Sequence, residues 1–269
     1  MSNRPRLPQS KEARMSKRKI KDILHFRKDL PPFLVHLTRK YKEKDAKDNL
    51  LCILKEKKLK QSGEHVSSIR FLIDSSTRKN WDNEKEKNFF SALSVTETPL
   101  DSIHCLIDIE GRQVNLEPYG IVFLKERLKT QNFHPVLYFN NSNRGDADLI
   151  LNAIGTLATS FSDKAELFFP LLTTFGYLVG SSKPNGGWHD FYWEREWRRP
   201  FCYGDFSFSF SEDPKNNDVF CGLCPEGEIN FFEARYHNIP FIDPMRPLSW
   251  YAQKLIARRK LLGLDHSVV

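Results

Sequence analysis

The stretch Phe33-Leu34-Val35-His36-Leu37-Thr38 decides most about the fold of this chain. It is a short, nearly continuous apolar run that ends in polar groups, which is typical of a central strand of a sheet. Other short apolar or alternating runs continue the pattern toward the C-terminus. They predict strands at residues 89–95, 119–124, 135–139, 191–198 and 206–210.

Segments with helical spacing lie between these runs. The apolar Leu50, Leu51, Ile53 and Leu54 are expected to point inward and the charged residues 55–57 outward, which predicts an amphipathic helix from Asn49 to near Gly63. Further helical or closing segments are expected at residues 125–129, 147–158, 164–178, 229–236 and 248–262. Strands and helices mix without a strict βαβ rhythm, so the predicted fold class is α+β.

Composition favours a globular domain behind a basic arm. The 269 residues are 40% hydrophobic and 13% aromatic, with 21 Phe, which excludes wholesale disorder and fibrous classes. Residues 1–28 hold ten Lys or Arg against Glu12 and Asp22, a balance of +8, so the rest of the chain sums to −1 of the total of +7. We expect an arm at residues 1–28 that is attracted to nucleic acid, or a merely solubilising tail, and one domain at residues 29–269.

The sequence carries no sign of export or of membrane insertion. The basic N-terminus is not followed by an apolar segment, and the longest apolar stretch, residues 167–180, is interrupted by Pro170 and two threonines. The five cysteines are an odd number without an export signal. We therefore expect a cytoplasmic protein with reduced thiols and no membrane partner.

Common catalytic signatures are missing from the chain. It has no Walker-type phosphate loop, no GxGxxG, no GxSxG and no HExxH. A single CxxC, Cys221 to Cys224, lacks a second pair, although Cys202, His189 and His237 could complete a zinc site if the fold gathered them. Buried or surface thiols are the alternative, and no metal site is predicted.

Two separated segments are the strongest functional signal. The first is His36-Leu37-Thr38-Arg39 at a strand end, and the second is the stretch WEREWR at residues 193–198. In a continuous strand, Glu194 and Glu196 would share one face, where two carboxylates repel each other unless each has a role or a cationic partner. An exposed strand edge with salt bridges to Arg39 or Arg198 is the alternative interpretation.

The run H-x-T-R, followed by N-L-x-x-I-L and a glycine, resembles the opening of DarT-like ADP-ribosyltransferases and of the AbiGi group of phage-resistance proteins. The stretches FSALSVTETPLDSIHCL, YGIVFLKERL and HPVLYF resemble the centre of the AbiGi group, and EREWR resembles its Glu-bearing strand. The likeness spans about residues 33–245. It departs from DarT-like proteins in a longer insertion, RKYKEKDAKD, between Thr38 and Asn49.

The resemblance implies an ADP-ribosyltransferase-like fold, with two small, mainly antiparallel sheets and flanking helices around a cleft for NAD. It implies Glu196 as the catalytic glutamate and Glu194 as the group that orients or deprotonates the acceptor. The residues implied for NAD binding are His36, Thr38, Arg39, Ser94, Thr96 and Tyr119. Cleavage of the nicotinamide–ribose bond passes through an oxocarbenium-like state, which a carboxylate stabilises.

Three functions follow as hypotheses. The first is an NAD-dependent mono-ADP-ribosyltransferase toxin of anti-phage or toxin–antitoxin defence, which modifies RNA or DNA and is held by an antitoxin protein. The second is an inactive protein of the same fold that acts as an antitoxin or nucleic-acid-binding regulator. The third is a nuclease that uses His36, His104 or His189 with the two glutamates.

Overall fold

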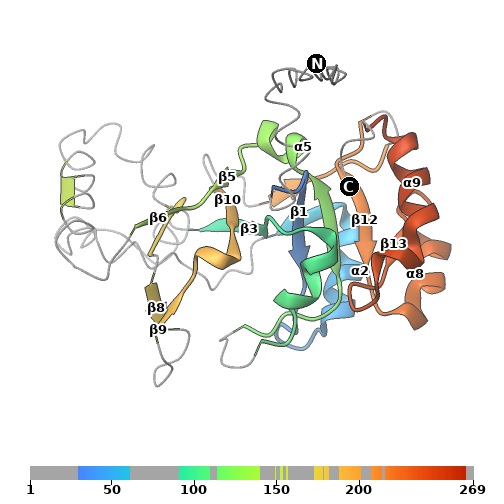
Figure 1. Ribbon diagram of the computed structural model, residues 1–269, viewed down its shortest axis with the longest axis horizontal. Helices are drawn as coiled ribbons and strands as arrows, with labels where there is room; N and C mark the ends of the chain where they lie inside the picture. The colour runs from blue at the N-terminus through green and yellow to red at the C-terminus, as the bar shows by residue number, and fades with distance from the viewer. Residues whose placement is uncertain are drawn as a thin grey trace, which may run out of the picture.

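A computed structural model describes residues 30–60, 91–109, 114–139, 149, 152–153, 156, 173–177, 179–181, 188–200, 207–213 and 216–264. The predicted basic arm, residues 1–28, lies outside the described residues, as does Gly63. Within the described part of the chain the fold is α+β, as predicted, and its main feature is one seven-stranded sheet (Figure 1). The expected two small sheets around a cleft are therefore replaced by one large sheet with smaller ones beside it.

The seven strands of this sheet are antiparallel except for one pair at the edge. Their spatial order is β13 (Phe241–Ile242), β12 (Val219–Leu223), β4 (Gly120–Leu124), β1 (Phe33–Leu37), β3 (Ala92–Thr96), β10 (Glu196–Pro200) and β5 (His134–Pro135). Only β12 and β13 run parallel. The central position predicted for residues 33–38 is confirmed, because β1 pairs with β4 on one side and β3 on the other.

Three two-stranded sheets accompany the large one within the described residues. They are β2 (Lys58–Lys60) with β11 (Ser207–Ser209), β6 (Leu137–Phe139) with β7 (Phe175–Tyr177), and β8 (Val179–Ser181) with β9 (Trp188–Asp190). Figure 1 shows β6, β8 and β9 at the end of the molecule away from β12 and β13. The predicted helix at 164–178 is wrong at its end, where residues 175–177 form β7, while the described positions of the 147–158 segment are helical as predicted.

The helices are short and lie beside the large sheet. They are α2 (Ala46–Glu56), α5 (Lys125–Thr130), α8 (Ile229–Arg235) and α9 (Ala252–Leu261), with 3-10 turns η2 (Leu100–Leu106), η3 (Tyr192–Glu194), η4 (Glu226–Glu228) and η5 (Leu248–Tyr251). No described helix combines the length and the apolar character that crossing a bilayer requires.

The limits of α2 differ from the prediction for a local reason. The Asp45 carboxylate accepts a hydrogen bond from the Asp48 N–H and caps the first turn, so the helix begins at Ala46 rather than Asn49. It ends at Glu56 because Lys57 adopts the left-handed conformation, with φ 52°. Part of the apparent insertion after Thr38 thus forms the first turn of α2.

The core lies around β1, β4 and β12, where apolar side chains from both faces are buried. Gly120 is needed where β4 passes β1, because a Cβ atom there would lie 2.4 Å from the His36 carbonyl oxygen. At the β12 bulge, the buried Arg258 of α9 donates hydrogen bonds to the carbonyls of Val219 and Phe220. The Arg258 guanidinium thereby supplies hydrogen-bond donors to two carbonyl groups at the place where the register between β12 and β4 shifts.

Candidate functional site

Strands β3 and β10 bring three of the predicted site residues together. Glu196 lies directly opposite Thr96, and Arg198 lies opposite Ser94. Directly opposed residues of an antiparallel pair point to the same face, so these four side chains share one face of the two strands. Ser94 is exposed and Thr96, Glu196 and Arg198 are partly buried, whereas Leu93 and Val95, which alternate with them, are buried. This face is therefore a polar, partly buried part of an otherwise apolar sheet.

Glu196 and Arg198 form a close ion pair on that face. The Arg198 Nη2 atom lies 2.6 Å from Glu196 Oε2, and Nη1 donates to the carbonyls of Thr173 at 2.8 Å and Phe175 at 3.3 Å. Burial works to lower the pKa of Arg198, but the charge and hydrogen bond of Glu196 outweigh it and raise this pKa. Arg198 thus joins the large sheet to the segment that leads into β7.

Tyr138 of β6 lies near this ion pair, because its hydroxyl feels the charges of Glu196 and Arg198. The Val136 N–H donates to the Glu196 carbonyl at 2.8 Å, so the chain between β5 and β6 runs beside the start of β10. Burial raises the pKa of Tyr138 well above its usual value, and the charges of Glu196 and Glu194 raise it further. We call Tyr138, Glu196 and Arg198 the Glu196 cluster.

Glu194 does not occupy the position that the sequence predicts. The expected strand from residue 191 is wrong before Glu196, because Tyr192–Glu194 form a 3-10 turn and Arg195 adopts a left-handed conformation with φ 43°. The turn is closed by hydrogen bonds from the Tyr192 N–H to Asp190 Oδ1 and from the Glu194 N–H to the Phe191 carbonyl. Glu194 and Glu196 are consequently not neighbours on one strand face.

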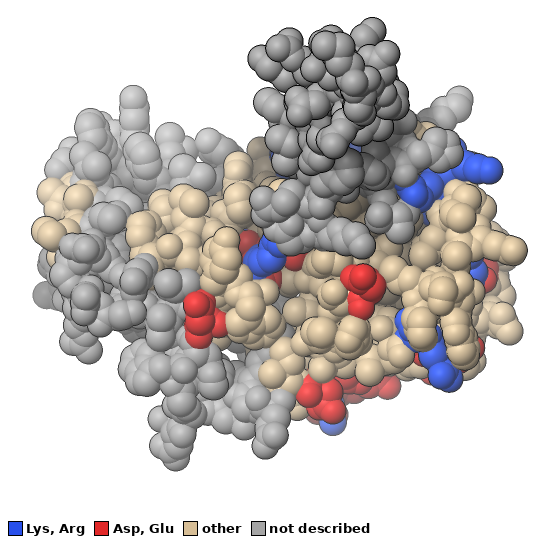
Figure 2. Space-filling model, in the orientation of Figure 1, with Lys and Arg blue, Asp and Glu red and all other residues tan. Residues whose placement is uncertain are grey.

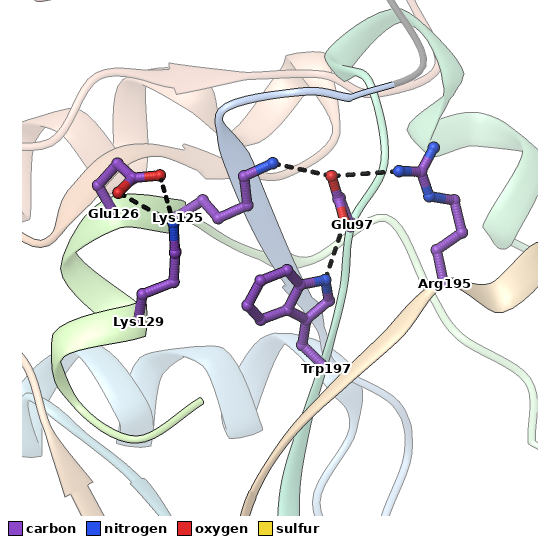
Figure 3. Close-up of polar contacts among 6 residues, drawn as sticks. All are labelled: Glu97, Lys125, Glu126, Lys129, Arg195 and Trp197. Carbon is purple, nitrogen blue, oxygen red and sulfur yellow. Dashed lines mark hydrogen bonds and ion pairs between the residues drawn. The ribbon is translucent and has the colours of Figure 1, made fainter. Parts of the chain in front are cut away.

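A second charged cluster surrounds Glu97, on the other face of the same two strands by alternation from Thr96. The side chain of Glu97 is only 8% exposed. Its Oε1 atom lies 2.8 Å from Lys125 Nζ and 3.2 Å from Arg195 Nη2, and its Oε2 atom accepts from Trp197 Nε1 at 2.9 Å (Figure 3). The backbone N–H of Glu97 also donates to the Arg195 carbonyl at 3.1 Å. We call Glu97, Lys125, Arg195 and Trp197 the Glu97 cluster.

Sequence reasoning assigned no role to Glu97, although a signal was present. The residue follows a predicted strand within the quoted stretch FSALSVTETPL, and Lys125 is the first charge after the apolar run of β4. Glu97 follows β3 and Lys125 follows β4, the two strands that flank β1, and two opposite charges buried at this edge of the sheet have to be paired. What no local pattern shows is that Arg195 and Trp197, a hundred residues away, complete the network.

The remaining predicted residues lie at β1 and the start of β4. His36 points away from Glu196 by alternation from Val35, and its Nδ1–H donates to the Ser94 carbonyl at 3.1 Å. Burial lowers the pKa of His36, so the ring is neutral near pH 7. The buried Thr38 hydroxyl lies 2.8 Å from the Ala46 carbonyl and 3.1 Å from the Tyr119 carbonyl. These groups are engaged within the fold.

Tyr119 and Arg39 occupy the same end of β1. Tyr119 packs its ring against Phe232, with 6.5 Å between the centroids, and burial followed by the Glu228 charge raises its pKa. The Arg39 carbonyl accepts from Asn49 Nδ2 at 2.8 Å, and its side chain is partly exposed. From strand rise and spacing, Thr38 and Glu196 lie on the order of 14 Å apart. The structure therefore separates the predicted binding residues into two groups.

The described residues contain no group of three or more metal-ligating side chains. Cys221 and Cys224 are buried free thiols whose pKa burial raises to about 12, so both stay protonated near pH 7. The side chains of Cys202 and His189, which were considered as zinc ligands, lie outside the described residues.

Surface charge does not single out another site on the face drawn in Figure 2. There, the acidic and basic side chains of the described residues are interspersed, without an extended patch of one sign. Comparison with known proteins finds no matching protein-family model, no matching curated protein and no matching solved structure.

Proposed function

We propose that this chain is an NAD-dependent mono-ADP-ribosyltransferase that modifies RNA or DNA in anti-phage or toxin–antitoxin defence. The proposal includes an ADP-ribosyltransferase-like arrangement of the site, a cytoplasmic location and an antitoxin protein that restrains the activity. The single observation that carries it is the polar face of β3 and β10, where Glu196 lies opposite Thr96 and beside Arg198 and Ser94. The resemblance of the motifs on these strands supports the same assignment.

The chemistry of this face suits cleavage of a glycosidic bond. A carboxylate that hydrogen-bonds the ribose 2′-OH strengthens this bond as positive charge develops on the sugar, and therefore stabilises the transition state more than the ground state. Glu196 has this role in the proposal, and Arg198 fixes one of its oxygen atoms. Ser94 and Thr96 supply hydroxyl groups beside it for the nicotinamide half.

The acceptor and the pyrophosphate of NAD are assigned in this proposal from charge. The +8 arm at residues 1–28 favours a polyanionic acceptor, and Arg39 is proposed for the pyrophosphate. Glu194 lies in the turn immediately before Glu196, from which it would act on the acceptor. His36 and Thr38 are proposed to hold the adenosine ribose and nearby groups, and Tyr119 is proposed to stack on the nicotinamide ring.

One observation favours the alternative of an inactive antitoxin or nucleic-acid-binding regulator of the same fold. The polar groups of His36 and Thr38 bond to carbonyls within the protein, and His36 lies on the face opposite to Glu196. Salt-sensitive binding of nucleic acid without any binding of NAD would favour this alternative.

The deciding experiment compares the wild type with Glu196→Gln in a transfer assay with labelled NAD and with RNA, DNA and lysate protein as acceptors. Glu126→Gln is the matched control, because Glu126 undergoes the same change while its side chain is 76% exposed on α5. We expect label on nucleic acid for the wild type and the control, and its loss with Glu196→Gln. No transfer by a folded wild-type protein to any acceptor contradicts the enzymatic proposal.

A further inference from the structure

The hydroxyl group of Tyr138 has an unusual position beside the proposed catalytic carboxylate. Strand β6 carries Tyr138 past the start of β10, and its backbone is held by the hydrogen bonds of Val136 to the Glu196 carbonyl and of Leu137 to the Thr174 carbonyl. On the β7 side, Tyr138 pairs with Gly176, where an added Cβ atom would lie 3.4 Å from the Tyr138 ring. These bonds fix the backbone of β6, and the backbone at Gly176 lies close against one side of the Tyr138 ring.

The hydroxyl oxygen is buried, and it makes no hydrogen bond of normal geometry to any described residue. The backbone N–H of Glu196 faces it, but an N–H group only donates, so the hydroxyl proton is left without an acceptor. Burial and the nearby glutamates raise the pKa of Tyr138, so the group keeps this proton. Beside the Glu196 carboxylate, which accepts, the fold therefore holds an unused donor.

We propose that Tyr138 is a further substrate-contacting residue, whose hydroxyl donates a hydrogen bond to an oxygen of the ribose that Glu196 binds. The inference rests on the proposed function and names the part of the substrate that this site recognises. An acceptor and a donor side by side match the vicinal hydroxyls of a ribose, each of which can both donate and accept. An aliphatic or purely cationic ligand would leave the Tyr138 proton unpaired.

The turn before Glu196 lies against the Tyr138 ring. The ring of Tyr192 lies edge-on to Tyr138, with 6.1 Å between the centroids, and Tyr192 is 65% exposed. Glu196 and Arg198 are 14% and 21% exposed in their side chains. Tyr192 is therefore an exposed neighbour of the Tyr138 ring on the side of the turn that precedes Glu196.

Tyr138→Phe tests the inference, because it removes only the hydroxyl. Tyr251→Phe is a matched control, because the Tyr251 hydroxyl is also buried without a normal hydrogen bond to the described residues and lies in η5, apart from the Glu196 cluster. Two measurements are made on both variants and the wild type: unfolding by urea without ligand, and binding of NAD by calorimetry.

We expect both variants to be as stable as the wild type or more stable, because neither loses a hydrogen bond in the free protein. Tyr138→Phe should weaken NAD binding about tenfold, as the loss of one hydrogen bond to ligand does, while Tyr251→Phe binds as the wild type. An unchanged affinity of Tyr138→Phe overturns the inference alone, as does a clear loss of its stability. If the wild type binds no NAD, the proposed function fails together with the inference.

Discussion

The Glu97 cluster and the Glu196 cluster share β3 and β10 but lie on opposite faces. They differ in how completely their buried polar groups are hydrogen-bonded. Both oxygen atoms of Glu97 have donors, supplied by Lys125, Arg195 and Trp197. In the Glu196 cluster the ion pair with Arg198 lies beside a hydroxyl whose proton has no acceptor among the described residues. The satisfied Glu97 network stabilises the fold, whereas the Tyr138 hydroxyl is the group that we propose donates to a ligand.

The location of the Glu97 cluster explains what it stabilises. It joins the end of β3, the end of β4 and the turn that precedes β10, since Lys125 follows β4 and Arg195 precedes Glu196. The left-handed Arg195 is held by its backbone as well as by its guanidinium. The Glu97 cluster thus positions the turn from which Glu196 enters the strand.

The largest effect on stability is expected from Glu97→Ala. The substitution leaves Lys125 and Arg195 without their shared carboxylate in a buried place, which typically costs about 3–5 kcal/mol of unfolding free energy. Urea unfolding measures it, with Glu126→Ala as the exposed control, for which we expect a change within about 0.5 kcal/mol. Equal effects of the two substitutions would show that the Glu97 cluster does not stabilise the fold.

The next effect separates activity from stability. Glu196→Gln should reduce transfer about 10²–10³-fold, corresponding to about 3–4 kcal/mol of transition-state stabilisation. Its unfolding free energy should fall less than that of Glu97→Ala, because Arg198 keeps its bonds to the Thr173 and Phe175 carbonyls. If Glu196→Gln loses as much stability as Glu97→Ala and keeps its transfer activity, Glu196 stabilises the fold and is not the catalytic carboxylate.

A smaller effect is expected from Trp197→Phe. This change keeps an aromatic ring on β10 but removes the Nε1–H donor to Glu97 Oε2, and the loss of such a buried partner costs about 1–2 kcal/mol. The measurement is a double-mutant cycle with Glu97→Ala, which removes the carboxylate that accepts this hydrogen bond. Strictly additive effects would contradict a direct interaction between the two side chains.

The smallest effect is a pH dependence that arises at His36. Burial lowers the pKa of this histidine in the folded state, so below about pH 6.5 the unfolded chain binds a proton that the folded protein does not. This contribution to stability is therefore present above pH 6.5 and is lost as the pH falls toward the folded pKa, by up to about 1 kcal/mol between pH 7 and 5.5. In His36→Gln, this part of the pH slope of the unfolding free energy should disappear, and an unchanged slope would assign it to other groups.

Local patterns predicted the elements whose role is set by their own side chains. Residues 33–38 were recognised as a central strand because an uninterrupted apolar run is stable only where both faces are covered. The turn after β4 was recognised because Lys125 to Lys129 are polar directly after an apolar run. The limits of α2 were missed because the predicted start ignored the cap at Asp45.

The misjudged elements depend on contacts that lie far apart in the sequence. The alternation of residues 191–198 predicts a strand, but the turn at Tyr192–Glu194 and the left-handed Arg195 interrupt it. Residues 175–177 form a strand because they pair with β6, although their apolar character is compatible with a helix. Pairing partners decide such cases, and a local pattern does not contain them.

By itself, the sequence determined the α+β class, the central strand and the uneven charge, because composition and periodicity express burial directly. Only the tertiary structure decided that Glu196 lies opposite Thr96 and that Glu97 pairs with Lys125 and Arg195. It also decided that the buried hydroxyl of Tyr138 has no hydrogen-bond partner among the described residues. The physical reason is that strand register and the satisfaction of buried polar groups are properties of segments that meet only after folding.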